Sequence, residues 1–317
     1  MESKVQSFIR GAHNLLPWHQ GCVATLGSFD GVHVGHQAIL RQLVRLAKET
    51  QLPSLVIIFE PQPQEFFLGD KAPARLMRLR EKIQALLAAG VDRVLCLSFS
   101  DYLRSLSAMD FIEQVLIQGV DVKHLVIGDD FRFGCDRRGD FSLLKQVGDQ
   151  KGFSVTDTVT LQIDGERVSS TRVRQCLEAG DFTAAERLLG KLYSISGRIV
   201  YGQQLGRQLG VPTANVHLRR YKSPLQGVFA VTAKVEGKSI QGVANIGVRP
   251  TVNGDKKLLL EVHLFDFSQK IYGKMIEVIF HKKLRSEKKF ASLDELQAQL
   301  KMDIDEAKAF FNLYPSP

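Results

Sequence analysis

The chain has few of the features that mark secreted, disulfide-bonded or membrane-spanning proteins. Four cysteines occur in 317 residues, far apart and never as Cys-x-x-Cys, which favours inert or buried thiols in a reducing compartment. No apolar run approaches the roughly 18 residues of a membrane span, and the first ten residues contain no apolar signal core. Internal repeats, low-complexity segments and long blocks of like charge are also missing. We therefore expect a cytoplasmic globular protein that does not bind membranes.

The length and composition indicate an ordinary two-domain protein. A chain of 317 residues corresponds to about two domains. Hydrophobic residues make up 44% and charged residues 24%, as in globular proteins. The net charge of +8 favours anionic partners, but it does not select nucleic acid over nucleotides.

A strand, a glycine-bearing turn and a helix follow one another between residues 22 and 47. Cys22 to Leu26 is a short apolar run typical of a buried strand, and Gly27 to Val34 has the composition of a turn. His36 opens a helical pattern in which apolar residues recur on one face: Ile39, Leu40, Leu43, Val44 and Ala47. The free N–H groups and the dipole at such a helix start favour an anion.

His33 and His36 lie at this predicted helix start. Three residues apart, they would share a face and reach the same phosphate, while Gly31 and Gly35 would let that phosphate approach the backbone. An isolated pair of this kind is more often two surface histidines. A zinc pair fits less well, because the spacing is not His-x-x-x-His and no Glu lies between them.

Strands and helices alternate after this first unit. Ser54–Phe59, Val94–Leu97 and Leu125–Ile127 read as strands. Helices are expected between them, one carrying Leu79, Ile83, Leu86 and Leu87 and ending at Gly90, and one running from a capping box at Ser107 and Asp110 to about Gly119. This alternation predicts a doubly wound parallel sheet.

Two further polar stretches have both a structural and a functional interpretation. Gly128 to Gly134 follows a predicted strand, where ligands bind in open α/β sheets, but it could equally be a solvated turn with an Arg stacked on rings. Val168 to Arg174 opens a helix that Gly180 ends. Its hydroxyls could be ordinary helix caps, or, with its arginines, could hold a triphosphate.

The composition changes near residues 186 to 192. Five strand-like runs follow, which predict an antiparallel barrel or sandwich: 193–200, 228–235, 240–244, 258–265 and 275–280. Gly237-Lys238-Ser239 reads as a hairpin turn between two of them and not as a phosphate loop. A capping box at Ser292 and Glu295 opens a C-terminal helix expected to pack on the barrel through Leu293, Leu296, Leu300, Ile304, Ala307 and Phe311.

The stretch from Gly206 to Asn215 carries the clearest polar signal of this second part. Glycines and a proline fix the loop, and Thr213 and Asn215 offer two neutral oxygens on one side of an extended segment, which suits Mg²⁺. A Pro-Thr turn with a locally bonded Asn is the plain alternative.

Several strings together resemble one family. Gly27-Ser28-Phe29-Asp30-Gly31-Val32-His33-Val34-Gly35-His36 resembles the signature of the His-x-Gly-His nucleotidyltransferases, and more narrowly the FAD synthetase half of the bifunctional riboflavin kinase/FAD synthetases. Residues 128–134 and 169–174 match two more motifs of that half, and 210–215, 224–229, 242–251 and 261–267 resemble riboflavin kinase motifs in the expected order. The resemblance covers about residues 20 to 311.

The resemblance implies two enzymes on one chain. Residues 1–187 would be a doubly wound FMN adenylyltransferase domain, and 188–317 a riboflavin kinase built on an antiparallel barrel with a C-terminal helix. Riboflavin, FMN, FAD and ATP would be the small-molecule partners, with Mg²⁺ as the metal and no tightly bound transition metal. Nucleic acid is not expected as a partner, and the sequence leaves the oligomeric state open, with a monomer allowed.

The resemblance also assigns roles to residues. Glu261 would be the kinase base, and His33 and His36 would act in adenylyl transfer. The implied ATP and phosphate contacts are Gly27, Phe29, Asp30, Gly35, Ser170, Thr171, Arg174, Gly210, Thr213 and Asn215, of which Thr213 and Asn215 would also hold the metal. The implied flavin or nucleotide contacts are Asp130, Phe131, Arg132, Arg249 and Arg285.

Some features leave alternatives open. Ser28 and Gln62 stand where many relatives have Asn and His, so contacts to ATP could differ. Glu261 could be a surface carboxylate paired with Lys256 or Lys257. The chain could also adenylylate another phosphorylated acceptor. A non-enzymatic nucleic-acid binder fits poorly, because the barrel's Phe residues lie in apolar runs and do not alternate with Lys and Arg.

Overall fold

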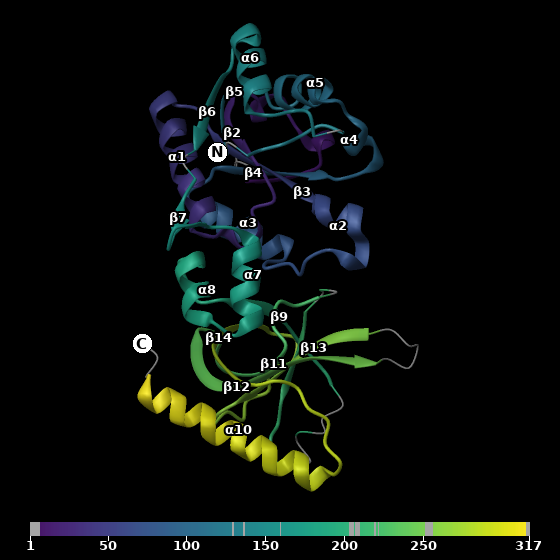
Figure 1. Ribbon diagram of the computed structural model, residues 1–317, viewed down its shortest axis with the longest axis vertical. Coiled ribbons are helices and arrows are strands. Elements are labelled where there is room, and N and C mark those ends of the chain that lie inside the picture. The colour runs from purple at the N-terminus through teal and green to yellow at the C-terminus, as the bar shows by residue number, and fades with distance from the viewer. Residues whose placement is uncertain are drawn as a thin grey trace. The chain divides into compact units, whose positions relative to one another are not determined.

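The computed structural model describes residues 7–128, 130–135, 137–158, 160–202, 206, 210–218, 220, 222–250 and 256–314, without the side chains of 249, 250, 256 and 257. The chain forms two compact units (Figure 1). Unit 1 comprises Met1–Pro73 and Met77–Ser170, and unit 2 comprises Ala74–Leu76 and Thr171–Pro317.

Unit 1 contains a six-stranded parallel sheet with the strand order β1-β4-β3-β2-β5-β6. The strands are β1 (Phe8–Arg10), β2 (Cys22–Leu26), β3 (Ser54–Glu60), β4 (Arg93–Ser98), β5 (Val122–Gly128) and β6 (Ser154–Thr158). The predicted doubly wound sheet is therefore confirmed. The chain moves from β2 outward to β4 and then returns to place β5 beside β2. Ligand sites in open α/β sheets form where the order reverses in this way, outside the carboxyl ends of the strands.

Helices cover both faces of this sheet. On one face α1 (Val34–Thr50) and α3 (Leu79–Ala88) share a core with β2, β3 and β4. On the other face α5 (Ala108–Phe111), the π-helical segment η5 (Ile112–Ile117) and α6 (Phe141–Lys151) share a second core. The shorter elements are η1 (Ala12–Asn14), η2 (Pro17–His19), η3 (Asp30–Val32), α2 (Pro63–Leu68), η4 (Gly69–Lys71), α4 (Asp101–Ser105), β7 (Gln162–Ile163) and β8 (Glu166–Arg167).

Unit 2 is a closed barrel with the strand order β10-β13-β12-β11-β14-β9. The strands are β9 (Ser194–Val200), β10 (Ala214–His217), β11 (Gly227–Val235), β12 (Lys238–Pro250), β13 (Lys256–Leu264) and β14 (Met275–Arg285). The helices are α7 (Ser170–Ala179), whose first residue belongs to unit 1, α8 (Phe182–Leu189) and α10 (Leu293–Leu313). The predicted antiparallel barrel with a C-terminal helix is confirmed.

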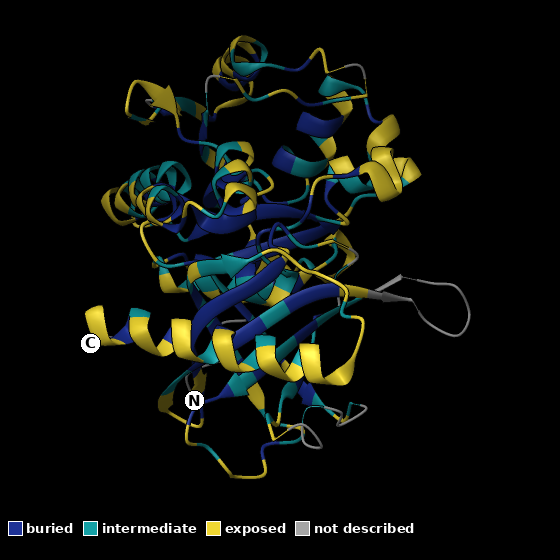
Figure 2. Cartoon of the chain, turned by 60° about the horizontal axis from the view of Figure 1, so that its bottom comes forward, coloured by how far each residue is buried: buried dark blue, intermediate teal, exposed yellow. Residues whose placement is uncertain are grey.

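The long helix α10 lies against the outside of the barrel and exposes its other side (Figure 2). Ala307 and Phe311 pack with Val228 and Ala230 of β11. The predicted cap is present, since Ser292 Oγ accepts from the N–H of Glu295 at 3.2 Å. Leu293 was wrongly expected to face the barrel: it is 58% exposed, because the first turn of α10 extends beyond the core.

Several local expectations need adjustment. Helix α1 begins at Val34 and not at His36, because His33 caps it. The helix expected from Ser107 to Gly119 is split into α5 and the wider π-helical turns of η5. The edge strands β1 and β6 and the short β10 were not predicted. The predicted hairpin between β11 and β12 is confirmed, but its two turn residues are Glu236 and Gly237, both at positive φ, and Lys238 and Ser239 belong to β12.

Three residues from the first half of the chain pack within unit 2. Arg174 Nε donates to the carbonyl of Ala74 at 2.6 Å, and the Tyr193 hydroxyl donates to that of Leu76 at 3.1 Å. Arg220 Nη1 donates to the carbonyl of Arg75 at 3.2 Å. Within the described residues no helix is both long and apolar enough to cross a membrane.

Candidate active sites

The first site is the turn between β2 and α1. His33 is the N-cap of α1, and its Nδ1 accepts from the N–H of His36 at 3.2 Å. The two imidazole rings stack with centroids 3.6 Å apart. A Cβ on Gly35 would lie 3.2 Å from the His33 ring, so glycine here makes room for that ring. The histidines therefore share a face as expected, but His33 also holds the helix start.

Phe29 and Asp30 are two buried residues of this turn. The Phe29 ring is 2% exposed and lies 5.0 Å from that of His36. Asp30 is 1% exposed, and its Oδ1 accepts from the N–H of Met77 at 3.0 Å. A Cβ on Gly27 would lie 3.3 Å from the Phe29 ring. The ring of Phe29 packs in the protein interior and the carboxylate of Asp30 accepts a backbone hydrogen bond there. Both side chains therefore stabilise the conformation of the turn.

Burial and nearby positive charge change the protonation of His36. Burial lowers the pKa of His36 well below its usual value, and His33, Lys82 and Arg167 lower it further. Its Nδ1 has no hydrogen-bond partner among the described residues. The imidazole is therefore neutral at pH 7, and it can act on a phosphate as a neutral hydrogen-bond donor.

The second predicted stretch follows β5, the strand beside β2. Asp130 forms an ion pair of 2.6 Å with Arg167, and the hydrogen bond from Arg167 lowers the pKa of this carboxyl. The rings of Phe131 and Phe133 stack at 5.6 Å, while the exposed Arg132 donates from Nη1 to the carbonyl of Phe131 at 2.9 Å. The structure therefore places this turn at the same edge of the sheet as the turn with the two histidines.

The third stretch opens helix α7. Ser170 Oγ donates to the carbonyl of Asp30 at 2.8 Å, a hydrogen bond within unit 1. Thr171 is exposed on the first turn. Arg174, one helical turn later, donates from Nε to the carbonyl of Ala74 at 2.6 Å.

The kinase candidates come together on the outer face of the barrel. Glu261 of β13 lies directly opposite Asn215 of β10 on one side and Asn245 of β12 on the other. Residues that pair in this way project from the same face of a sheet. Thr213, two residues before Asn215, lines a pocket that Glu261 and Asn245 also line. The register of the barrel thus aligns one carboxylate between two amides.

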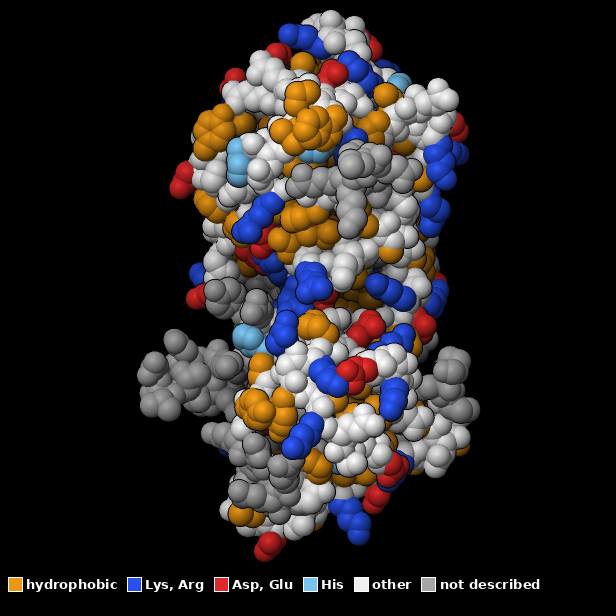
Figure 3. Space-filling model, turned by 180° about the vertical axis from the view of Figure 1, so that it is seen from behind, with side chains coloured by type: hydrophobic (Ala, Val, Ile, Leu, Met, Phe, Trp, Pro, Cys, Tyr) orange, Lys and Arg blue, Asp and Glu red, His pale blue; other side chains and the backbone are white. Residues whose placement is uncertain are grey.

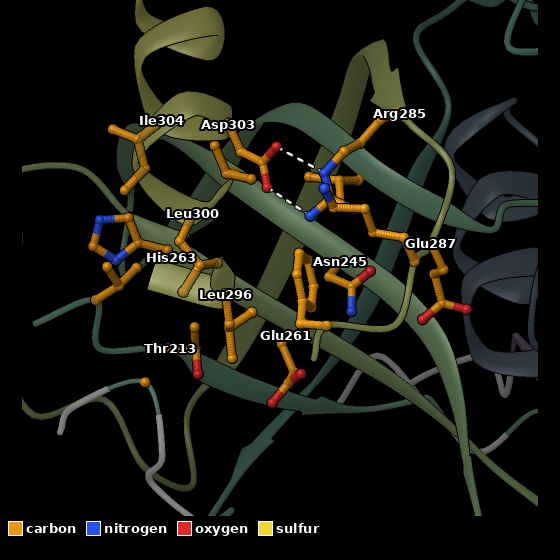
Figure 4. A pocket seen from close by; sticks show the side chains of 16 residues that line it. Thr213, Asn245, Glu261, His263, Arg285, Glu287, Leu296, Leu300, Asp303 and Ile304 are labelled. Atoms are coloured by element: carbon orange, nitrogen blue, oxygen red, sulfur yellow. Dashed lines mark hydrogen bonds and ion pairs between the residues drawn. The ribbon is translucent and has the colours of Figure 1, made fainter. Parts of the chain in front are cut away.

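The pocket lies between these strands and helix α10 (Figure 4). Its volume is about 190 Å³. Leu296, Leu300 and Ile304 of α10 supply apolar lining, and Thr213 and Glu261 lie together in the lower part of the view. His263 lines it from β13, with its Nδ1 2.9 Å from the carbonyl of Pro212, so this nitrogen is the donor.

Arg285 forms part of the pocket wall. Its Nε and Nη2 donate to the two carboxylate oxygens of Asp303 at 2.8 and 2.7 Å, as the dashed lines in Figure 4 show. The side chain of Asp303 is 3% exposed. Arg285 thus ties the end of β14 to α10. Gly210 lies at φ +76°, where glycine is favoured, and the side chain of Arg249 lies outside the described residues.

Comparison with known proteins identifies both halves of the chain. Residues 16–172 match the family model described as FAD synthetase, and residues 189–311 match the one described as riboflavin kinase. The chain belongs to the bifunctional riboflavin kinase/FAD synthetase family. Like other members of this family, it has both riboflavin kinase and FMN adenylyltransferase activity, with riboflavin, FMN, FAD and ATP as substrates or products.

Relatives of this family resemble the chain over nearly its whole length. A bifunctional riboflavin kinase/FMN adenylyltransferase from Pseudomonas fluorescens is 55% identical, over 95% of this chain and 96% of its own. One from Escherichia coli K12 is 52% identical, over 96% and 98%. A crystal structure titled macrolide-efflux protein, from Streptococcus pneumoniae, is 30% identical with a TM-score of 0.81, covering 96% of this chain and 99% of that one. From this last similarity we take the shared fold alone.

Three residues that line the barrel pocket were missed by the sequence analysis. Asn245 lies in a string that resembles a riboflavin kinase motif, but its position opposite Glu261 depends on strand register. His263 lies two residues after Glu261, on the same face of β13. Asp303 is an acidic residue on an amphipathic helix, and its pairing with Arg285 appears only when α10 is docked.

The polar groups of the barrel pocket suit a divalent metal, which kinase and adenylyltransferase activities generally need together with ATP. Asn245 Oδ1 is buried and has no hydrogen-bond partner among the described residues. The Thr213 hydroxyl and the Glu261 carboxylate also line this pocket, Asn215 pairs with Glu261 on the neighbouring strand, and hard cations prefer such oxygens. No group of three or more His, Cys, Asp and Glu side chains suited to a metal occurs in the described part of the chain. Neutral oxygens and substrate phosphates would therefore complete the coordination.

The ion pair between Asp303 and Arg285 gives a stability prediction. Asp303→Ala leaves the guanidinium, whose side chain is 21% exposed, without its partner. Breaking a buried pair in this way costs about 3 kcal/mol, so the free energy of unfolding in urea should fall by that amount. The matched control is Glu306→Ala, which removes an α10 carboxylate paired with Lys282 at 2.9 Å at an exposed position and should cost under about 1 kcal/mol. Equal losses for the two variants would contradict the role given to Asp303.

Proposed function

We propose that the two activities reside at the two sites described above. The adenylyltransferase would lie within residues 1–187 and the riboflavin kinase within 188–317. The alignment of Glu261 between Asn215 and Asn245 carries the kinase assignment, because it places one carboxylate among neutral oxygens on the wall of a pocket. The stacked His33 and His36 at the start of α1 carry the other assignment.

In riboflavin phosphorylation, Glu261 would accept the proton of the ribityl 5′-hydroxyl as that oxygen attacks the γ-phosphorus of ATP. The bond from the γ-phosphorus to the bridging oxygen breaks, and ADP leaves. Thr213 and Asn215 would orient the phosphates, and the apolar side chains of α10 would exclude water. The metal, when bound, would neutralise phosphate charge, and we propose Mg²⁺ held by Thr213 and Asn215.

In adenylyl transfer, a phosphate oxygen of FMN would attack the α-phosphorus of ATP, and pyrophosphate would leave. This step needs no protein nucleophile. His36, as a neutral donor, and the N–H groups at the start of α1 would stabilise the charge that develops on the α-phosphate. Thr171, Arg174 and Ser170 are proposed to hold the departing pyrophosphate, and Gly27, Gly35 and Gly210 to let phosphates approach the backbone at the two sites. Phe29 and Asp30 would act by shaping the turn.

Other assignments remain proposals of the same kind. We propose that Asp130, Phe131 and Arg132, which follow β5, contact a nucleotide or flavin, and that Arg249 and Arg285 contact a flavin or nucleotide at the kinase site. We also propose a cytoplasmic protein that does not bind nucleic acid. On the face shown in Figure 3, Asp, Glu and hydrophobic side chains occur among the Lys and Arg side chains.

Truncated chains test the kinase assignment and the boundary between the domains. Helix α8 packs on the barrel: Phe182 is 6% exposed, and its ring lies 5.9 Å from that of Phe229. A fragment of residues 171–317 should therefore be more stable in urea than one of 188–317, by at least the roughly 3–5 kcal/mol that losing a buried Phe costs. The longer fragment should convert riboflavin to FMN and make no FAD, as flavin chromatography would show. A folded 171–317 fragment without kinase activity would contradict the proposal.

A further inference from the structure

The segment that joins β14 to α10, residues 286–292, forms one wall of the barrel pocket. Glu287, Lys288 and Phe290 of this segment line the pocket. All of its residues are described, and none of them lies in a helix or strand. Its conformation therefore depends on contacts with the residues around it, and these contacts decide the shape of this side of the pocket.

The guanidinium of Arg285, the last residue of β14, contacts this segment twice. Its Nη1 donates to the carbonyl of Ser286 at 3.0 Å, and its Cζ lies 5.8 Å from the centre of the Phe290 ring. A cation at such a distance over an aromatic ring is attracted to it, and the ammonium of Lys288 lies 5.0 Å from the same ring centre. A change in the position of Arg285 should therefore move the Phe290 ring, which lines the pocket.

A carboxylate of α10 fixes this guanidinium in turn. Arg285 donates from Nε and Nη2 to the two oxygens of Asp303, at 2.8 and 2.7 Å, and such a bidentate pair sets the orientation of the guanidinium as well as its distance. Gln299, one helical turn before Asp303, donates from Nε2 to Oδ1 of Asp303 at 2.9 Å. The Asp303 side chain is 3% exposed, so salt in the solvent screens the pair little.

The strand order of the barrel separates the two kinase substrates along this pocket. The proposed phosphate ligands Thr213 and Asn215 lie next to or in β10, on one side of β13, whereas β12, β11 and β14 follow on its other side. In Figure 4, Thr213 and Glu261 lie in the lower part of the view, and Arg285 and Asp303 lie in the upper part. In-line transfer puts the attacking hydroxyl and the leaving ADP on opposite sides of the γ-phosphorus. Riboflavin would therefore approach Glu261 from the side of Arg285 and α10.

The lining on that side suits the flavin ring. Leu296, Leu300 and Ile304 of α10 are apolar, and Phe290 is aromatic. Such side chains favour a flat and largely apolar ring system.

We propose that Asp303 is a positioning residue for riboflavin binding. It holds Arg285, and Arg285 holds the segment 286–292 in the position that receives the flavin ring. The proposal rests on the assignment of the kinase to this pocket. Asp303 acts through Arg285 and not on the reacting atoms, so its loss should weaken the binding of riboflavin and spare both the binding of ATP and the chemical step.

Steady-state kinetics of FMN formation by the full-length chain test this role. Asp303→Asn keeps the size of the side chain but removes its charge and one acceptor oxygen. It should raise the KM for riboflavin about tenfold, the effect of one charge-assisted hydrogen bond, and leave kcat and the KM for ATP within about twofold. The matched control is Glu306→Gln, which alters an exposed carboxylate of the same helix and should change none of the three.

A double variant shows whether Asp303 acts through Arg285. Arg285→Met should raise the KM for riboflavin at least as much as Asp303→Asn does. Adding Asp303→Asn to it should cause no further rise, because the effects of residues that act as a unit are not additive. Additive effects of the two changes would overturn the proposal. So would an unchanged KM for riboflavin in a folded Asp303→Asn variant, or an equal rise in the KM for ATP.

The failure of this role can be told from a failure of the kinase assignment. If Glu261→Gln lowers kcat while Asp303→Asn leaves the KM for riboflavin unchanged, the pocket is the kinase site and Asp303 is structural only. If both variants form FMN as the wild type does, the assignment is wrong and the proposal falls with it. If Asp303→Asn or Arg285→Met fails to fold, Gln299→Ala decides, because it removes one hydrogen bond to the Asp303 carboxylate. A rise of about threefold in the KM for riboflavin alone would support the role, and an unchanged KM would refute it.

Discussion

Replacing His36 with alanine should abolish most FAD formation and leave riboflavin phosphorylation near normal. The imidazole lies at the start of α1, stacked on His33, and is neutral at pH 7 because burial lowers its pKa. Losing one hydrogen-bond donor to the developing charge typically costs about 10²–10³ in rate, or ~2.7–4 kcal/mol. Initial rates of FAD formation from FMN and ATP, and of FMN formation from riboflavin and ATP, measure the two effects separately.

The matched control is His13→Ala, which removes an exposed histidine of η1 in the same unit and should change neither rate. Because His33 also caps α1, His33→Ala is less informative: it would lower stability together with FAD formation. If His36→Ala lowered both activities equally while the chain stayed folded, the separation of the two sites would be wrong.

Replacing Glu261 with glutamine should lower FMN formation by about 10²–10⁴-fold, the usual worth of general-base assistance. The amide keeps the size of the side chain between Asn215 and Asn245 but cannot take the hydroxyl proton. The KM for ATP should change little, because the ligands proposed for the phosphates remain. FAD formation from supplied FMN should be unaffected, since the residues assigned to adenylyl transfer all precede residue 175.

Glu306→Gln is the control for this change, because it alters an exposed carboxylate of the same unit. A Glu261 that merely paired with a surface lysine would contribute under about 1 kcal/mol of stability and leave the rate unchanged. If Glu261→Gln formed FMN at an undiminished rate, the assignment of Glu261 as the general base would be wrong.

The local features of the sequence predicted much of this fold. The strand Cys22–Leu26, the turn after it and the Ser292 cap are encoded within a few residues each, so periodicity and capping chemistry suffice to find them. The hairpin at Glu236 and Gly237 is of the same kind. The two activities were predicted only from the resemblance to a family, because the motifs that carry it lie far apart in the sequence. No single local pattern indicates either activity.

What the sequence did not predict depends on contacts between distant residues. Asn245 faces Glu261 only because the barrel closes in one register, and Asp303 meets Arg285 only because α10 docks on β14. From the sequence, the carboxylate of Asp30 was expected to contact ATP or a phosphate. The structure shows its carboxylate buried against the backbone of Met77, 47 positions away. Burial of a polar side chain by a distant backbone group leaves no mark in the local sequence.

Mixing the two variants tests most directly the central claim that one chain carries two separate sites. Neither His36→Ala nor Glu261→Gln alone should make appreciable FAD from riboflavin, ATP and Mg²⁺. Combined in one tube, they should restore FAD formation, because FMN made by the first variant can be adenylylated by the second. A mixture that forms FMN but no more FAD than His36→Ala alone, although Glu261→Gln adenylylates supplied FMN, would contradict two sites linked by free FMN.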